Sequence, residues 1–421
     1  MRQPRRILEL AVGGAALTAL LACGRPPHPA VSTAPLAPGV YRAVLTLPGG
    51  ELPFGFEVVE VDGHKSVYIR NGAESIHANE LEEHAGRFVL RFPGYENRIE
   101  AARDGDGYRG VAVMIRRGGH EVRLPFGLTE GRNYRFAEQP TPNASDVGGR
   151  WALTFMGKDG TPAPAIAELT QHDSHVTGTV LDPTGDHRFL EGDVVGDELR
   201  LSRFDGGSAF LYHARVLPGG TLSGGFWSGN WSHSDLSGRR DEGAMLSDPA
   251  IGAAADAKSA PFAFSFPDLD GRTVSFTDAR FLDKVVVVAL GGSWCPNCHD
   301  EAAFLAPLYR EYRSRGLEIV YLQFEYFGDF PSAVAANRRF VSEFGINWPV
   351  LIAGTSDRDE ASRKLPRLGH VYAFPTTLVL DRKGELRNVH SGFSGPATGK
   401  HYDEYRQEFT GLIESLLAEH N

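Results

Sequence analysis

Two different hydrophobic patterns divide the chain into two folded blocks. Between about residues 39 and 240, short segments alternate apolar and polar positions, and turns rich in Gly, Asp and Asn separate them, as at 61–63 and 71–72. An alternation with a period of two predicts antiparallel β-strands joined by tight turns. This block has no strong helical pattern. We therefore expect an all-β N-terminal region.

The β-region is internally duplicated at a spacing of about 110 residues. The matching segments are 39–41 with 149–151, 56–58 with 167–169, and 88–92 with 198–202. A repeat of this length predicts two similar antiparallel β-modules, each a small barrel or sandwich. We place the first module at residues 39–138 and the second at 146–240.

The block from residue 261 to 421 instead alternates strand and helix patterns. The continuous apolar run from Val285 to Leu290 is typical of a buried central strand. A helix-like stretch follows, and Gly316 is a suitable stop signal for it. Further predicted elements are strands at 317–324, 350–352, 377–380 and 385–390, a helix at 332–344 and a helix at the C-terminus. The chain is thus a multidomain protein whose second part is an α/β domain.

The N-terminus has the pattern of an export signal. Three arginines in the first six residues precede an uncharged run over 10–22, which predicts a secretory signal peptide over residues 1–22. The run is shorter than the about 20 apolar residues of a spanning helix. Its end, LLACG at 20–24, resembles the lipobox of bacterial lipoproteins. This resemblance implies that Cys23 is lipidated and anchors the chain to a membrane, the alternative being an ordinary signal peptide.

Two segments have the composition of connections rather than of folded structure. Residues 23–38 are rich in Pro and Ala, and residues 241–260 contain few bulky apolar side chains. We expect an extended tether at the first and an interdomain linker at the second.

Charge and cysteine content narrow the class of protein. The net charge is -10, which provides no broad basic surface for nucleic acid. Of the three cysteines, lipidation of Cys23 would leave only Cys295 and Cys298, two residues apart. A disulfide between them would close too small a loop to stabilise an exported protein much, so we expect the pair to have a chemical use.

The segment 292–298, GSWCPNC, lies between the buried strand and the helix, and FPTT follows much later at 374–377. This arrangement resembles the thioredoxin superfamily. With FPDLDG at 266–271 and FGINWPV at 344–350, it is similar to the TlpA and ResA group of exported disulfide reductases. The resemblance implies a thioredoxin-like domain over 261–421, protein substrates with disulfides, and a membrane electron donor of the DsbD or CcdA type. We expect no cofactor.

The candidate catalytic residues are Trp294, Cys295, Cys298, Glu301 and Pro375. At a helix N-terminus Cys295 meets the positive end of the helix dipole, which favours the thiolate, so we expect it to be the exposed nucleophile. Cys298 would be the resolving thiol. The resemblance implies that Trp294 precedes the nucleophile and that Pro375 is a cis-proline facing the pair.

Glu301 stands three positions after Cys298, where TlpA-like sequences carry a glutamate. In that role it could relay a proton to Cys298, the alternative being a solvated acid in the first turns of a helix. Two departures bear on this role: Ala289 stands where thioredoxins place a buried acid, and Ala303 replaces a common Pro.

Three other interpretations have weaker support. Residues 295–299, CPNCH, also fit covalent haem attachment with His299 as an axial ligand, but the Trp294 motif and Pro375 favour a thioredoxin, which makes His299 an exposed helix residue. His172 and His175 fit a solvated turn better than a metal site, and we expect no metal. In the third, the β-modules bind a ligand while the cysteine pair only senses redox state.

We therefore expect a lipid-anchored thiol-disulfide oxidoreductase in the periplasm or at the cell surface. Pro296 and Asn297 separate the cysteines, so the histidine that can stabilise the thiolate in oxidases of the superfamily is missing. This absence favours a disulfide reductase.

Overall fold

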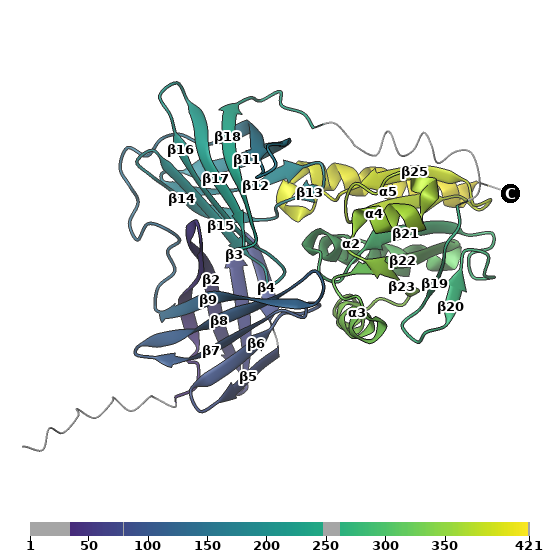
Figure 1. Ribbon diagram of the computed structural model, residues 1–421, viewed down its shortest axis with the longest axis horizontal. Helices are drawn as coiled ribbons and strands as arrows, with labels where there is room; N and C mark the ends of the chain where they lie inside the picture. Colours follow the sequence, from purple (N-terminus) through teal and green to yellow (C-terminus); the bar gives the residue numbers. More distant parts are fainter. Residues whose placement is uncertain (1–33, 79, 247–261, 420–421) are drawn as a thin grey trace, which may run out of the picture.

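The structure, a computed structural model, describes residues 34–78, 80–246 and 262–419. Two β-modules lie on one side and an α/β domain lies on the other (Figure 1). The predicted signal peptide and Cys23 lie outside the described residues. Among the helices in the described ranges, none combines the length and the apolar character needed to span a bilayer.

The first β-module is a strongly curved sheet of nine antiparallel strands in the order β4-β3-β2-β1-β9-β8-β7-β6-β5. Inward positions alternate with outward ones along each strand, as the period of two predicts. Its strands are β1 (Gly39–Leu47), β2 (Gly50–Val61), β3 (His64–Asn71), β4 (Glu74–Ala78), β5 (Glu80–His84), β6 (Arg87–Arg91), β7 (Arg98–Asp104), β8 (Gly107–Arg116) and β9 (His120–Glu130).

The second β-module is a closed antiparallel barrel, because β11 pairs with both β10 and β12. The short strand β13 extends β12 as a hairpin that projects toward the α/β domain (Figure 1). Its strands are β10 (Gly149–Met156), β11 (Pro162–His172), β12 (His175–Asp182), β13 (Gly185–Asp186), β14 (Leu190–Val195), β15 (Glu198–Phe204), β16 (Ala209–Val216), β17 (Thr221–Ser228) and β18 (Ser232–Arg240).

The predicted duplication is visible in matching contacts. The Tyr41 hydroxyl donates to the Ala37 carbonyl oxygen at 2.7 Å, and Trp151 Nε1 donates to the Val147 carbonyl oxygen at 2.8 Å. Each aromatic residue thus ties the first strand of its module to the residue four positions before it. The prediction of two similar antiparallel β-modules is confirmed.

The expected tether at 23–38 is too long at its C-terminal end. Leu36 is 1% exposed and packs in the core of the first module, where its backbone N donates to Glu83 Oε1 at 2.6 Å. At the start of the expected linker, Ala244 accepts two hydrogen bonds from Arg150. The tether therefore ends in packed structure through Leu36, and the linker begins in packed structure through the Ala244 carbonyl group. One apolar side chain or one carbonyl group is enough to attach such a short segment to a folded module.

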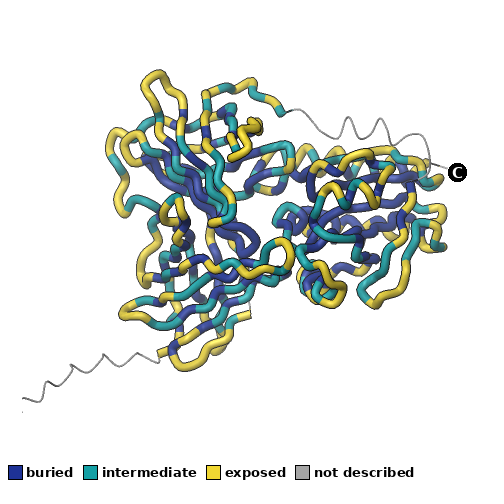
Figure 2. The backbone as a smooth tube through the Cα atoms, in the orientation of Figure 1, coloured by how far each residue is buried: buried dark blue, intermediate teal, exposed yellow. Residues whose placement is uncertain are grey.

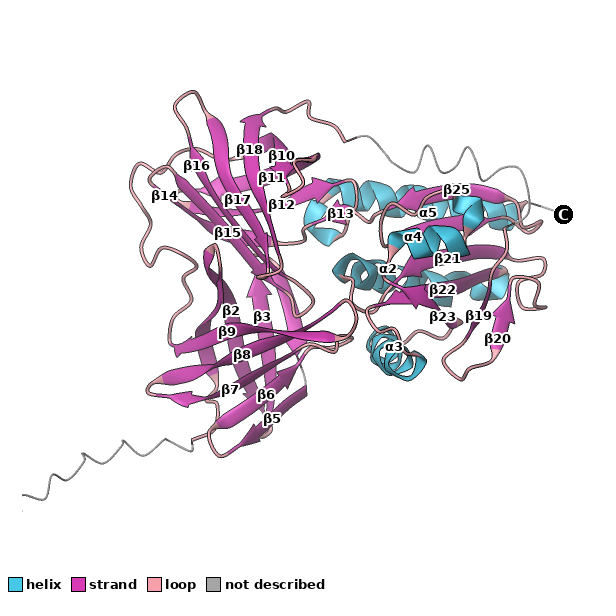
Figure 3. Cartoon of the chain, viewed as in Figure 1, coloured by secondary structure: helices cyan, strands magenta, loops and turns pink. Residues whose placement is uncertain are grey.

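The C-terminal domain is a five-stranded sheet in the order β23-β22-β21-β24-β25, with helices on both faces (Figure 3). Strands β21, β22 and β23 are parallel, whereas β24 and β25 are antiparallel to their neighbours. The elements are β19 (Ser265–Pro267), β20 (Thr273–Ser275), β21 (Val285–Gly291), α2 (Pro296–Tyr312), β22 (Leu317–Glu325), α3 (Phe330–Phe344), β23 (Val350–Thr355), α4 (Arg358–Lys364), β24 (Thr376–Leu380), β25 (Leu386–Ser391) and α5 (Lys400–Ala418).

The central strand β21 is buried on both faces (Figure 2). Val285 and Val287 face the core shared with α2, α3 and α5, while Val286 and Val288 face the core under α4. This explains the continuous apolar run in the sequence. The short helix α4 was not predicted; its start depends on the side chain of Asp357, which accepts from Glu360 N at 2.8 Å.

Candidate active site

Cys295 and Cys298 are joined by a disulfide at the N-terminus of α2, directly beyond the carboxyl end of β21. Cys295 is the N-cap of the helix, and its Sγ accepts from Cys298 N at 3.2 Å. Pro296 occupies the first helical turn, where a missing N–H costs nothing. A thiolate formed at Cys295 would therefore meet both the helix dipole and a backbone donor.

Two of the other three predicted residues, Pro375 and Trp294, flank the disulfide. The Phe374–Pro375 bond is cis, as predicted, and the Phe374 carbonyl oxygen lies 3.5 Å from Cys295 Sγ. Trp294 donates from Nε1 to the Phe324 carbonyl oxygen at 2.8 Å, and its ring stacks on Tyr326 with centroids 4.4 Å apart. Segments of three different strand ends therefore converge on the cysteine pair.

Both cysteines are buried. Cys295 is 4% exposed and Cys298 is 3% exposed, so the expectation that Cys295 alone is accessible is wrong for this arrangement of the chain. A cysteine at a helix N-terminus would normally lie at the surface of a single α/β domain. Here the β-modules lie over this end of the domain (Figure 1).

Glu301 is buried rather than solvated, which removes the alternative of a surface acid. It is 2% exposed and accepts a hydrogen bond from the Thr377 hydroxyl. Burial raises its pKa to about 8, against the opposing effect of the Thr377 hydrogen bond. Thr377 pairs with Ala289 across β24 and β21, so Glu301 places a carboxyl beside the position where thioredoxins carry their buried acid.

Sequence reasoning did not identify Glu325, a second buried acid at this edge of the sheet. Its Oε1 accepts from Ser293 N at 2.8 Å and from Asn337 Nδ2 at 2.9 Å, and its Oε2 accepts from Ser293 Oγ at 2.8 Å. Burial raises its pKa. It ties the turn before Trp294 to β22. The sequence contains one indication of this role, because Glu325 is an acid at the end of the apolar strand β22.

His299 is buried, not exposed as the sequence predicts. It is 6% exposed, its Nε2 lies 2.8 Å from the Ser293 carbonyl oxygen, and its ring stacks on Tyr95 of the first module with centroids 3.9 Å apart. Burial lowers its pKa to about 3, so the ring is neutral. His299 is buried because Tyr95 of another domain covers it, and the pattern of apolar positions along a helix does not predict such a contact. A ring held this way, beside a closed disulfide, is also not arranged as a haem ligand.

The next residue of α2 connects all three parts of the chain. Asp300 pairs with Arg188 of the second module at 3.0 Å, and Arg188 also pairs with Glu74 of the first module at 2.8 Å and with Asp205 at 3.2 Å. Burial raises the pKa of Asp300 to about 7, and the nearby carboxylates of Asp186, Glu74 and Asp205 raise it further, against the opposing effect of Arg188. The first turns of the helix after the disulfide are thus held by both modules.

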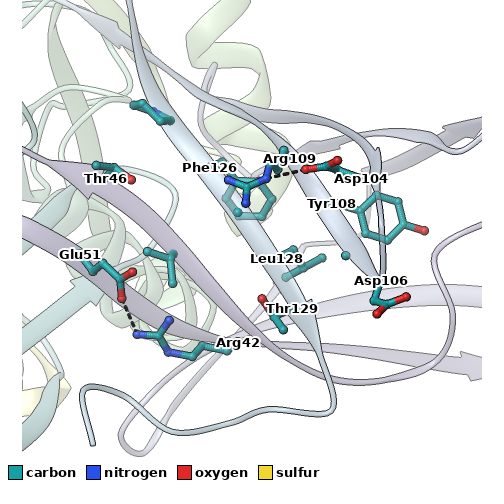
Figure 4. Close-up of a pocket in the computed structure, with 14 residues that line it drawn as sticks. Arg42, Thr46, Glu51, Asp104, Asp106, Tyr108, Arg109, Phe126, Leu128 and Thr129 are labelled. Carbon is teal, nitrogen blue, oxygen red and sulfur yellow. Dashed lines mark hydrogen bonds and ion pairs between the residues drawn. The ribbon is translucent and has the colours of Figure 1, made fainter. Parts of the chain in front are cut away.

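The first module also carries a hollow of about 330 Å³ (Figure 4). Four of its charged side chains form two ion pairs, Arg42 with Glu51 and Arg109 with Asp104. His175 lies 3.6 Å from Asp193, and no cluster of three potential metal-binding side chains occurs within residues 34–78, 80–246 and 262–419.

Comparison with known proteins places the similarity in the C-terminal part. Residues 255–404 match the Redoxin family. The chain is 28% identical over 135 residues to the thiol-disulfide oxidoreductase ResA of Halalkalibacterium halodurans, a match that covers 31% of this chain and 65% of that protein. It is 28% identical over 147 residues to ResA of Bacillus thuringiensis subsp. konkukian, covering 35% of this chain and 75% of that protein.

Among solved structures, the chain is similar to a thiol:disulfide interchange protein of the thioredoxin family from Chlorobium tepidum TLS. The sequences are 21% identical, the match covers 38% of this chain and 99% of that one, and the TM-score is 0.29.

Proposed function

Since the C-terminal domain belongs to the TlpA/ResA-like group of the thioredoxin superfamily, we propose that this chain reduces disulfides in protein partners outside the cytoplasm. The observation that carries the proposal is the Cys295–Cys298 disulfide, held at the N-terminus of α2 opposite a cis-proline. A redox titration of the full chain tests it.

The exchange proceeds from the reduced pair. The Cys295 thiolate attacks one sulfur of the partner disulfide, forms a mixed disulfide and releases the other partner sulfur as a thiolate, which takes up a proton. Cys298 then loses its proton and attacks Cys295 Sγ. This step closes the Cys295–Cys298 disulfide and releases the second partner thiol, so two electrons pass to the partner. A membrane donor of the DsbD or CcdA type would restore the dithiol.

Glu301 supplies the proton acceptor for the second step in this proposal. Its carboxyl sits on the same helix as Cys298, one turn further on, in a position shielded from solvent. A pKa of about 8 lies near that of a thiol, so proton transfer between the two groups costs little free energy. The Thr377 hydroxyl donates to this carboxyl, and Thr377 pairs with Ala289 on the neighbouring strand.

The proposed location depends on Cys23. With acyl chains on this residue, the chain would be held at a membrane surface, and the described part of the first module would begin about a dozen residues later. Cys23→Ala should abolish lipidation and leave the precursor uncleaved by the lipoprotein peptidase. Metabolic labelling with palmitate and the mass of the N-terminal peptide measure this. Cleavage and release of the variant at the wild-type rate would instead show an ordinary signal peptide.

A further inference from the structure

The hairpin formed by β12 and β13 reaches from the second module to the redox motif. Leu181 pairs with Asp186 and Asp182 with Gly185, so Pro183 and Thr184 form its two-residue tip. Gly185 has a φ of 139° and lies directly against the Asn297 side chain, where a Cβ would overlap the amide nitrogen. Asn297 is one of the two residues between the cysteines. The tip therefore touches the motif itself.

The same hairpin lies against the loop that follows β25. A Cβ at Gly392 would come within 3.0 Å of the Thr184 carbonyl oxygen, and Gly392 N donates to the Pro375 carbonyl oxygen at 2.8 Å. The backbone of the cis-proline segment, the loop after β25 and the hairpin thus form one continuous rim. One side of the disulfide is consequently bounded by a different domain.

Two polar contacts hold the hairpin in place. Asp186 Oδ1 accepts from Gly395 N at 3.0 Å, in a buried position. Arg188, two residues further on, pairs with Asp300 of α2 at 3.0 Å. Because one contact lies on the loop after β25 and the other on the active-site helix, the hairpin cannot shift along the rim without breaking at least one of them.

The remaining access is narrow. The stack of Tyr95 on His299 places the first module over the next turn of α2. Trp294, Pro296 and Asn297 keep partial exposure, while both cysteines are buried. Within the segment 292–298, exposed surface is therefore limited to these three residues, and the hairpin contacts one of them, Asn297.

We propose that the β12–β13 hairpin is a specificity element of the redox site. It admits small disulfides and cysteines in extended or flexible segments to Cys295, and it excludes disulfides that are part of a broad folded surface. This inference rests on the proposed disulfide-exchange function.

The test compares one small and one folded substrate on the full chain. Deleting Pro183 and Thr184 removes the tip and leaves Asp182 and Gly185 as an Asp-Gly loop, a favoured two-residue turn, with the Leu181–Asp186 pair retained. The control variant is Pro218→Ala, at an exposed position in the β16–β17 turn at the opposite end of the same barrel, which keeps the positive-φ Gly219 and Gly220. Rate constants of each reduced protein are measured with oxidised glutathione and with native insulin.

The expected result is a rise of about tenfold in the insulin-to-glutathione rate ratio for the tip deletion, equivalent to about 1.4 kcal/mol, and no change for the control. An unchanged ratio in the deletion variant would overturn the proposal. If melting shows that the deletion variant does not fold, Asp186→Ala keeps the hairpin length but removes the Gly395 contact, and its ratio should rise in the same direction. Failure of every variant and of the wild type to reduce either substrate would contradict the proposed function instead.

Discussion

Cys295→Ser should reduce the rate of disulfide reduction by the full chain to the uncatalysed rate. Cys295 is the N-cap of α2, and its Sγ already accepts from Cys298 N at 3.2 Å, so the dipole and a backbone donor both stabilise its thiolate. A serine hydroxyl is not ionised at neutral pH and cannot form the mixed disulfide. The measurement is turnover of oxidised glutathione, because the proposed hairpin function admits small disulfides to Cys295.

Cys298→Ser is the matched variant, because it keeps the nucleophile and removes only the resolving thiol. It should accumulate a stable mixed disulfide between Cys295 and the substrate, visible as a mass increase that a reductant reverses. Trapping to the same extent by both single variants would contradict the assignment of roles, since an equivalent pair of thiols has no defined nucleophile.

Glu301→Gln should make the oxidised protein more stable than the wild type at high pH but not at low pH. Burial raises the folded-state pKa of Glu301 to about 8, from 4.5 for a glutamate in water. Below about pH 4.5 the carboxyl is protonated in both the folded and the unfolded protein, and the wild type has its full stability. As the pH rises from there through 8, the unfolded protein releases this proton more readily than the folded protein, so the free energy of unfolding falls. At about 1.4 kcal/mol per pKa unit, the wild type loses on the order of 5 kcal/mol relative to the variant across this range.

The measurement is urea unfolding of both oxidised proteins at pH 4.5, 6 and 9. The other acidic groups with a raised pKa, including Asp300, are present in both proteins. The difference in unfolding free energy between the two proteins therefore reports on Glu301 alone. A stability difference that stays constant with pH would show that Glu301 has an ordinary pKa. In that case the carboxyl could not exchange a proton with Cys298 in the way proposed here.

Local patterns were enough to predict the class of each block, the redox motif and most elements of the C-terminal domain, though not α4. The apolar run of β21 predicts a strand buried on both faces, and the motif at 292–298 predicts a cysteine pair at a helix start. The duplication could be predicted because Tyr41 and Trp151 occupy equivalent positions and form equivalent hydrogen bonds in the two modules. These features depend on neighbours close in sequence or on a repeat, which a single chain displays directly.

Contacts between the domains were not predictable in the same way. His299 follows the helical pattern of an exposed residue, yet Tyr95 covers it from a loop about 200 residues earlier in the chain. Arg188 likewise resembles any polar residue after a turn, although it pairs with three carboxylates from three parts of the structure. Which surface meets which depends on the shape of whole domains, and no short-range pattern records it.

The direction of electron flow is the central claim, and a redox titration of the full chain against glutathione tests it most directly. His299 is neutral, because burial lowers its pKa to about 3, and it is turned toward Ser293. A strong oxidant of this fold stabilises its reduced thiolate, but a neutral His299 adds no positive charge to stabilise the Cys295 thiolate. We predict a potential between about -200 and -270 mV, the range of glutaredoxins and thioredoxin. A potential near the DsbA value of about -120 mV would show that the chain donates disulfides rather than reducing them.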